Sequence, residues 1–215
     1  FFVAAVGQGA FALYYPPNDG RHDMRRLLTA VVVLLAISGT ARAAAVGDDG
    51  LHKQPWFAET FLILAEDMAE ADAQGKRVAV IFEQKGCPYC REMHAVNFQV
   101  PELTDFVKKN FTVLQLNLWG SREVTDLDGK AMEERDLARR WRVNFTPTIV
   151  FLPTPEEMKA GETEVARMPG YFKPFHFHSM FEYVKAGAYK DQPFQRFLQH
   201  KFEEMEKAGK KPKVW

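Results

Sequence analysis

Apolar residues recur along this chain with two different spacings, which assign most of it to helices or strands. Over 56–73 they recur every three or four residues between acidic side chains, which predicts a helix with one buried face. The run 78–82 is apolar throughout, which predicts a buried strand. The same reasoning predicts further helices over 88–95, 102–107, 132–141, 174–185 and 192–207, and further strands over 111–118, 148–152 and 164–168.

Helices separate most of the predicted strands, so we expect an α/β fold with a mixed central sheet flanked by helices. Pro101 is expected to break the helical stretch that follows 88–95. The segment 119–130 has little periodicity and several turn residues, which predicts an inserted loop or short hairpin. The last helix belongs to a C-terminal extension whose apolar side is expected to pack on the core, with docking of a partner as the alternative.

The N-terminal part of the chain has the pattern of an export signal. Two arginines follow Met24, an apolar stretch covers 27–37, and Ala41 and Ala43 form a small-residue cleavage site. A permanent membrane anchor is the alternative, but the stretch is shorter than the roughly 20 residues that cross a bilayer. The expected divisions are an upstream segment outside any domain (1–23), the signal peptide (24–43), a linker (44–55), the folded domain (56–190) and the C-terminal helical extension (191–215).

Composition limits the partners. Lys and Arg number 28 and Asp and Glu number 28, so the formal net charge is 0, and no nucleic-acid partner is expected. Only two cysteines are present, Cys87 and Cys90. Two residues between them close too small a loop for the pair to be an effective structural staple. A chemical role for the cysteines is therefore the better interpretation.

The pair stands between a predicted strand and a predicted helix. A cysteine at a helix N-terminus has its thiolate stabilised by unpaired backbone N–H groups and by the helix dipole, which lowers the thiol pKa. Lys85 and Arg91 add positive charge on either side. We therefore expect Cys87 to be the attacking nucleophile and Cys90 the resolving thiol of a redox-active disulfide, with no other cofactor.

A zinc site is the alternative for the cysteines. Cys87 and Cys90 with His94 and either His176 or His178 would supply four ligands. No second Cys-x-x-Cys or His-x-x-x-His supports that site, so no metal is expected. We expect His94 to be a residue of the helix surface rather than a catalytic base, and the other two histidines to be packing or surface residues.

Three motifs together carry a resemblance to a known family. They are Gly86-Cys87-Pro88-Tyr89-Cys90 after a strand, Thr146-Pro147-Thr148 before a strand, and Gly170-Tyr171 before a helix. With these motifs the chain resembles the thioredoxin superfamily, which implies a thioredoxin-like fold. More narrowly, 82–90, 118–123 and 145–148 look like the SoxW-type periplasmic thioredoxins of bacterial sulfur-oxidation systems. The resemblance covers roughly 56–200.

The resemblance implies a periplasmic thiol-disulfide oxidoreductase that reduces protein disulfides or persulfides. Pro147 would be a cis-proline lying against the cysteines, with Thr146 offering its backbone to an extended substrate. Pro88 and Tyr89 would also contact substrate, although Tyr89 could instead cover the disulfide. The implied partners are protein disulfide substrates, a membrane thiol-electron transporter as donor, and sulfur-carrier proteins.

Two departures from ordinary thioredoxin leave the direction of electron flow open. The residues between the cysteines are Pro88 and Tyr89 rather than Gly and Pro, so a disulfide oxidase or isomerase is the alternative function. Ile81 stands where thioredoxin has a buried aspartate that helps to deprotonate the resolving cysteine. Glu83, on the same strand face, could take over this proton transfer; alternatively it is a solvated carboxylate at the strand end.

Overall fold

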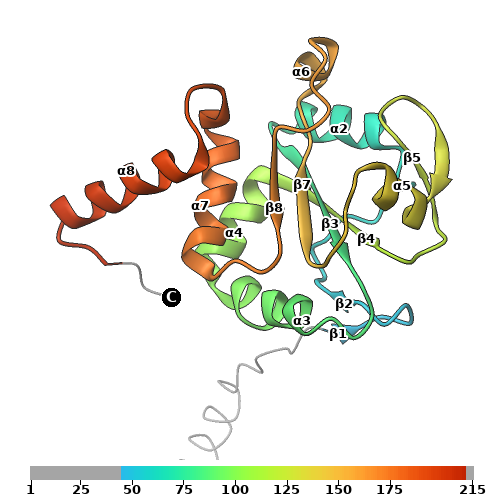
Figure 1. Ribbon diagram of the computed structural model, residues 1–215, viewed down its shortest axis with the longest axis horizontal. Coiled ribbons are helices and arrows are strands. Elements are labelled where there is room, and N and C mark those ends of the chain that lie inside the picture. Colours follow the sequence, from blue (N-terminus) through green and yellow to red (C-terminus); the bar gives the residue numbers. More distant parts are fainter. Residues whose placement is uncertain (1–44, 212–215) are drawn as a thin grey trace, which may run out of the picture. The chain divides into compact units, whose positions relative to one another are not determined.

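A computed structural model describes residues 45–211 and contains a four-stranded mixed sheet in the order β4-β3-β7-β8 (Figure 1). The strands are β3 (Arg77–Glu83), β4 (Phe111–Asn117), β7 (Thr148–Phe151) and β8 (Ala166–Pro169). β3 pairs with β4 in parallel and with β7 antiparallel, and β7 pairs antiparallel with β8. The mixed sheet and its strands confirm the predicted α/β thioredoxin-like fold, with shifts of one or two residues at most strand ends.

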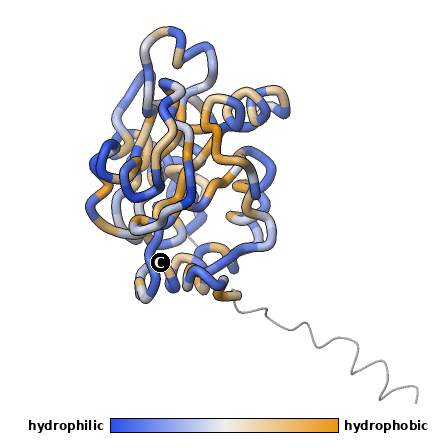
Figure 2. Tube along the Cα trace, turned by 90° about the vertical axis from the view of Figure 1, so that its right-hand side faces the viewer, coloured by the Kyte–Doolittle hydropathy of each residue, from blue (hydrophilic) through white to orange (hydrophobic). Residues whose placement is uncertain are grey.

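β3 is the central strand and separates two apolar cores. Val78, Val80 and Phe82 point into one core, whereas Ala79 and Ile81 point into the other. All five are almost completely buried, because both faces of the sheet are covered by helices. This explains why the run 78–82 is apolar without alternation. The apolar stretches gather along these central strands (Figure 2).

Helices cover both faces of the sheet. α2 (Leu64–Ala73) and α5 (Glu134–Arg140) contribute to the core on one face. α3 (Pro88–Ala95), α4 (Pro101–Asn110) and α7 (Pro174–Lys185) contribute to the core on the other. The remaining helical elements are η1 (Asn97–Gln99), α6 (Pro155–Lys159), η2 (Ala188–Lys190) and α8 (Phe194–Lys207). In the described part of the chain, no helix has the length and apolar character needed to cross a membrane.

The predicted helix 56–73 is wrong in its first half, because α2 begins only at Leu64. The residues before it run along β4, where the Ala58 backbone N–H donates to the Val113 carbonyl over 2.9 Å. Trp56 and Phe57 pack edge-on against Phe98. Pairing to the open edge of β4 and burial of these rings hold this segment out of the helix.

The stretch expected to be a linker contains two short paired strands, β1 (Ala45–Val46) and β2 (His52–Lys53). We call residues 45–54 the N-terminal strap. Leu51 in the strap is completely buried, and the Gln115 amide of β4 donates to the His52 carbonyl over 2.7 Å. A short, mostly polar stretch with three scattered apolar residues gave no periodicity from which this packing could be predicted.

The segment 119–130 was expected to form a loop or short hairpin. The structure has a short hairpin here, formed by β5 (Glu123–Thr125) and β6 (Ala131–Glu133), and its second strand lies just beyond the predicted segment. The following helix therefore begins at Glu134 rather than at residue 132. α6 was not predicted. It is a short helix (Pro155–Lys159) that starts with a capping box. The Thr154 side chain accepts from the Glu157 backbone N–H, and the Glu157 side chain accepts from the Thr154 backbone N–H.

The C-terminal extension contains α8, as predicted, and α8 packs on α7 through aromatic rings. Phe194 and Phe197 lie 5.5 and 5.3 Å from the Tyr183 ring. No α8 residue is fully buried, so the contact is partial. The predicted upstream segment (1–23) and signal peptide (24–43) lie outside the described residues, as does the end of the extension (212–215).

Candidate functional site

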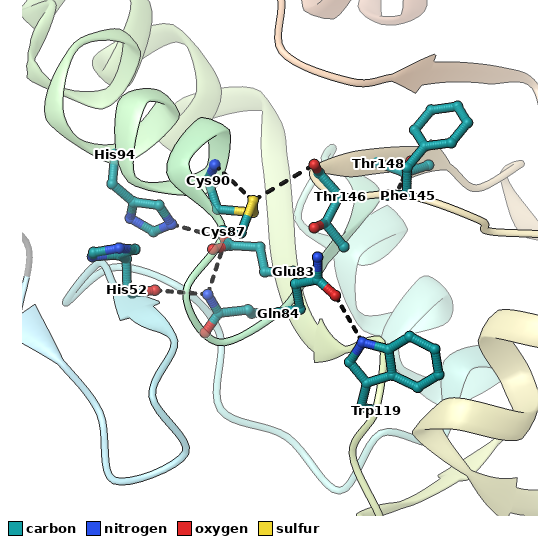
Figure 3. The surroundings of a disulfide bond; sticks show 11 residues. His52, Glu83, Gln84, Cys87, Cys90, His94, Trp119, Phe145, Thr146 and Thr148 are labelled. Atoms are coloured by element: carbon teal, nitrogen blue, oxygen red, sulfur yellow. Dashed lines mark hydrogen bonds and ion pairs between the residues drawn. A yellow bond between two sulfur atoms is a disulfide. The ribbon is translucent and has the colours of Figure 1, made fainter.

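The two cysteines are joined in a disulfide at the start of α3 (Figure 3). Their Cα atoms lie 5.3 Å apart. β3 ends at Glu83, and Gly86 then takes a positive φ of 75°, which turns the chain toward the helix. Cys87 is the N-cap of α3 and Pro88 occupies its first turn, where a missing N–H costs nothing. The strand, turn and helix thus place both sulfurs at the carboxyl end of the central strand.

The two sulfurs differ in their surroundings. Cys87 Sγ accepts a hydrogen bond from the Cys90 backbone N–H over 3.0 Å, in addition to lying at the positive end of the helix. Cys87 retains 5% exposure, whereas Cys90 has none. A thiolate at Cys87 would be stabilised by this donor, and only Cys87 can meet a sulfur that approaches from outside.

The second motif lies against Cys87. The bond between Thr146 and Pro147 is cis, and the Thr146 carbonyl oxygen is 3.5 Å from Cys87 Sγ. Both residues are buried. The Pro147 carbonyl accepts the Gly170 N–H over 2.8 Å. The third motif is therefore bonded directly to the second, and all three predicted motifs meet at the disulfide.

Tyr89, between the cysteines, is 61% exposed, so most of its ring faces solvent. Its ring stacks on Tyr171, with the centroids 6.2 Å apart and the planes 13° apart. The Tyr171 hydroxyl donates to the Asn97 side-chain oxygen over 3.1 Å. Tyr171 is thereby fixed, and it holds the Tyr89 ring at the surface beside the exposed Pro88.

Sequence reasoning gave no role to two further aromatic residues of this surface, Trp119 and Phe145. They are 65% and 54% exposed. The Trp119 indole N–H donates to the Gln84 side-chain oxygen over 2.7 Å, and Phe145 directly precedes Thr146 (Figure 3). We call Tyr89, Trp119 and Phe145 the aromatic rim. Large aromatic residues beside both motifs were the signal that could have identified it.

Glu134, the first residue of α5, fixes the Trp119 turn. The Glu134 carboxylate accepts the Asn117 backbone N–H over 3.2 Å and pairs with Arg122. A side chain at Gly120 would collide with this carboxylate, so only glycine fits there. Glu134 is 1% exposed. The buried Glu134 carboxylate therefore holds the turn that carries Trp119.

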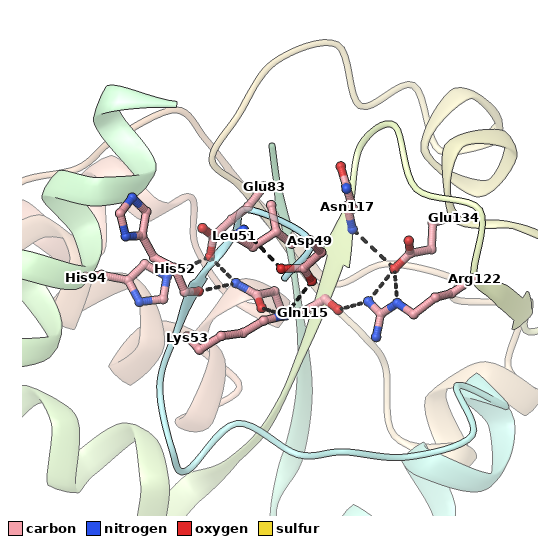
Figure 4. Close-up of polar contacts among 10 residues, drawn as sticks. All are labelled: Asp49, Leu51, His52, Lys53, Glu83, His94, Gln115, Asn117, Arg122 and Glu134. Atoms are coloured by element: carbon pink, nitrogen blue, oxygen red, sulfur yellow. Dashed lines mark hydrogen bonds and ion pairs between the residues drawn. The ribbon is translucent and has the colours of Figure 1, made fainter. Parts of the chain in front are cut away.

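The expectation that His94 lies on the helix surface is wrong, and the alternative of a solvated carboxylate is ruled out for Glu83. Glu83 has no exposure. His94 is not a surface residue, because it too has none, and its Nε2 lies 2.8 Å from Glu83 Oε1 (Figure 4). The i, i+4 spacing places His94 on the same face of α3 as Cys90, and that face packs on the sheet. The two polar residues thus pair in the interior.

The zinc constellation does not assemble. Within residues 45–211, no three His, Cys, Asp or Glu side chains converge on a metal position. His94 is turned to Glu83, and His178 packs against the Phe106 ring at 5.0 Å. His176 lies beside Phe175. The two histidines of α7 are packing residues, as predicted.

Comparison with known proteins agrees with this geometry. The family model described as "Thioredoxin-like domain" matches residues 64–185. A thioredoxin-fold protein from Helicobacter pylori is 24% identical, with 71% of this chain and 90% of that chain covered at a TM-score of 0.53. A thioredoxin from Thermus thermophilus is 30% identical, with 57% and 83% covered at 0.42.

The oxidised C-terminal domain of Neisseria meningitidis DsbD is 17% identical, with 59% of this chain and 96% of that domain covered at a TM-score of 0.40. No curated protein sequence matches the chain. The family model covers more than half of the chain and includes the cysteine pair, the cis-proline and the helix that follows Tyr171.

Proposed function

Because the chain belongs to the thioredoxin-like domain family, we propose that it is a thiol-disulfide oxidoreductase that reduces disulfides or persulfides of other proteins. The observation that carries this proposal is the asymmetric pair at the start of α3. Cys87 Sγ accepts a backbone hydrogen bond at the helix N-terminus, whereas the Cys90 side chain is completely buried. That arrangement suits one attacking thiolate and one resolving thiol.

The reaction proceeds in two exchanges. The Cys87 thiolate attacks one sulfur of the substrate disulfide, forms a mixed disulfide, and releases the other sulfur as a thiolate that takes up a proton. Cys90 then loses its proton and attacks Cys87 Sγ. The Cys87–Cys90 disulfide forms, the second substrate sulfur leaves as a thiol, and two electrons have passed to the substrate. A dithiol donor restores the starting state by the reverse exchanges.

Substrate would lie in an extended conformation over the cis-proline. The Thr146 carbonyl beside Cys87 Sγ is the backbone group at the point of attack. The aromatic rim adds exposed apolar surface next to both motifs, since Tyr89 lies between the cysteines and Phe145 directly precedes Thr146. Most large apolar side chains elsewhere in the described chain are covered. Exposed aromatic groups around a reactive sulfur favour a polypeptide substrate with an apolar side chain near its cysteine.

Replacing Trp119 with alanine is expected to lower kcat/KM for a protein disulfide such as insulin by about ten-fold, as loss of a binding Trp does. The rate with glutathione disulfide should change much less, since a small polar substrate offers little apolar surface to bind against the Trp119 ring. Phe61→Ala removes a 94% exposed ring that precedes α2 and is the matched control. Equal losses with insulin and glutathione disulfide would rule out a binding role for Trp119.

The proposal also includes a narrower family and a cellular role. We infer a SoxW-type periplasmic thioredoxin that receives electrons from a membrane thiol transporter and keeps sulfur-carrier proteins or other periplasmic disulfides reduced. The three motif stretches that resemble this group support the inference, since two of them carry the cysteines and the cis-proline. The signal-like stretch over 24–43 is the support for export.

The experiment that tests the direction is the equilibrium reduction potential of the Cys87–Cys90 couple in glutathione buffers. A reductase is expected between about −270 mV, the thioredoxin value, and roughly −200 mV at the upper end of glutaredoxins. A value near −120 mV, typical of a strong disulfide donor, would make the protein an oxidase instead. Failure of the couple to exchange with glutathione at all would reject the oxidoreductase proposal.

A further inference from the structure

Lys85 and Arg91 place two positive charges beside the disulfide, one before it and one after it along the chain. Both side chains are exposed. Within residues 45–211, neither of them forms an ion pair with a carboxylate. A cation without a neighbouring carboxylate attracts other anions more strongly than a paired one does, because nothing nearby cancels its field. These two charges are therefore available to a bound partner.

The N-terminal strap packs against the stem of Lys85. Gly50, in the turn of the strap, has a positive φ of 76°, and a Cβ atom at this position would lie 2.7 Å from Lys85 Cγ. The strap backbone thus lies directly on the aliphatic part of Lys85, although the residue as a whole stays exposed. A side chain whose stem is already packed loses less conformational entropy when its charged end binds. Lys85 is therefore a cation held in place two residues before Cys87.

Arg91 lies near the strap as well. Burial lowers the pKa of the strap residue His52, and Arg91 is among the charges that lower it further. The next residue, Glu92, acts in another direction, since its charge adds to burial in raising the pKa of Tyr171. The positive charge of Arg91 is thus directed to the same side of the site as Lys85.

Little negative charge in the strap offsets these two cations. The strap has two acidic residues, Asp48 and Asp49. Asp49 pairs with Lys53 at 2.7 Å (Figure 4), which leaves only Asp48 against Lys85 and Arg91. The side of the site that adjoins the strap is therefore cationic.

The aromatic rim occupies a different side of the site. Figure 3 shows the strap residue His52 on one side of Cys87, and Trp119 and Phe145 on the other. Successive residues of an extended polypeptide advance by about 3.3 Å, so a substrate that crosses the cis-proline places its residues at different distances from the point of attack. One substrate can therefore contact the cationic side and the aromatic rim at the same time.

We propose that the substrates of this site are polypeptides with an acidic residue beside the reactive cysteine, and that Lys85, together with Arg91, determines this specificity by binding the carboxylate. The inference rests on the proposed function and names the substrate class of that site. An acidic substrate is attracted to the two cations as it approaches, whereas a basic one is repelled. A more distant apolar residue of the same substrate contacts the aromatic rim.

The test compares three peptides, each a dimer joined by the disulfide of its single cysteine. In the three dimers the cysteine is flanked on both sides by Glu, by Gln or by Lys, with identical apolar residues further out. The reduced full chain is mixed with each dimer, and the second-order rate constant of reduction is followed by chromatography and mass spectrometry. In about 20 mM salt, the Glu dimer should be reduced at least about ten-fold faster than the Lys dimer, with the Gln dimer between them.

Salt and two charge reversals test the origin of this preference. In about 0.5 M salt the ratio of the Glu rate to the Lys rate should fall below about three, because the screening length is then only about 4 Å. Lys85→Glu should lower the ratio in dilute salt to about one or below, and Arg91→Glu should lower it as well. Any change in the thiolate fraction of Cys87 alters all three rates by the same factor, so the ratio reports charge recognition alone.

Lys109→Glu is the matched control, because it makes the same change in net charge at an exposed residue of the last turn of α4. α4 leads into the amino end of β4, whereas the cysteines follow the carboxyl end of the parallel strand β3. Lys109→Glu should therefore keep the wild-type ratio. A wild-type ratio near one, or an equal fall in Lys85→Glu and Lys109→Glu, would overturn the proposal. If the proposed function were wrong, none of the three dimers would be reduced, so the two failures differ.

Discussion

Cys90→Ser is expected to convert this protein into a trap that holds its substrate as a covalent adduct. The Cys87 thiolate still attacks, because its stabilising N–H comes from the backbone of residue 90 and survives the substitution. The adduct persists, since serine cannot displace the substrate sulfur. With insulin as substrate, non-reducing electrophoresis and mass spectrometry should show a stoichiometric adduct that dithiothreitol releases. Catalytic reduction of insulin should fall by more than about a thousand-fold, as it does when one member of a catalytic unit is lost.

Cys87→Ser is the matched control and should give neither adduct nor turnover. The remaining thiol of Cys90 is completely buried and cannot meet an external disulfide. The two substitutions are identical in chemistry and lie three residues apart, so a difference between them reports only the position of the thiol. Equal trapping by both variants would reject the roles assigned here to the two cysteines.

The parts of the fold and the site that could be predicted are those set by local pattern. β3 was predictable because both of its faces are covered, so its run 78–82 is apolar throughout. The position of Cys87 at a helix start was predictable because a strand pattern ends just before it and Pro88 suits a first turn. The cis-proline loop was expected from Thr146-Pro147-Thr148 through a family resemblance, and the structure places it at the disulfide.

The parts that could not be predicted depend on contacts between distant segments. In the sequence Glu83 and His94 are polar residues at a strand end and on a helix. Their burial depends on contacts with distant segments, among them Gln54 of the strap with His94 and Gln115 of β4 with Glu83. Likewise, the first half of the predicted helix 56–73 has a helical pattern, yet pairing of Ala58 with the edge of β4 prevails. In each case a partner more than thirty residues away decides the local structure.

Glu157 is the clearest example of such a long-range contact. It lies in the unpredicted α6, and it joins the start of β3 to η2. Arg77 pairs with it, the Tyr189 hydroxyl donates to it, and Lys190 lies 2.7 Å away. The Thr154 N–H donates to it over 2.8 Å. Burial by itself would raise the pKa of Glu157, but Lys190, Tyr189, the Thr154 N–H and the Arg77 charge lower that pKa from its usual 4.5 to about 2.

Glu157→Gln is therefore expected to lower the free energy of unfolding at pH 7 by about 1.5 kcal/mol, roughly half of what the full pKa shift would give, because solvent screens the pair with the exposed Lys190. The folded-state pKa is depressed, so the folded state binds fewer protons than the unfolded chain between about pH 4.5 and about pH 2. The stabilisation is fully present above pH 4.5 and is lost as the pH falls toward 2. Urea titrations of both proteins from pH 7 to 2.5 should show the difference shrinking through this window.

Glu156→Gln is the matched control, because Glu156 is exposed in the same first turn of α6 and carries the same charge. It should change the unfolding free energy by less than about 0.5 kcal/mol, as surface substitutions generally do. If Glu157→Gln were as mild as Glu156→Gln, or if its effect were the same at pH 7 and pH 2.5, the charge of Glu157 would not be what joins α6, β3 and η2. Hydrogen bonding that glutamine reproduces would then account for the contact.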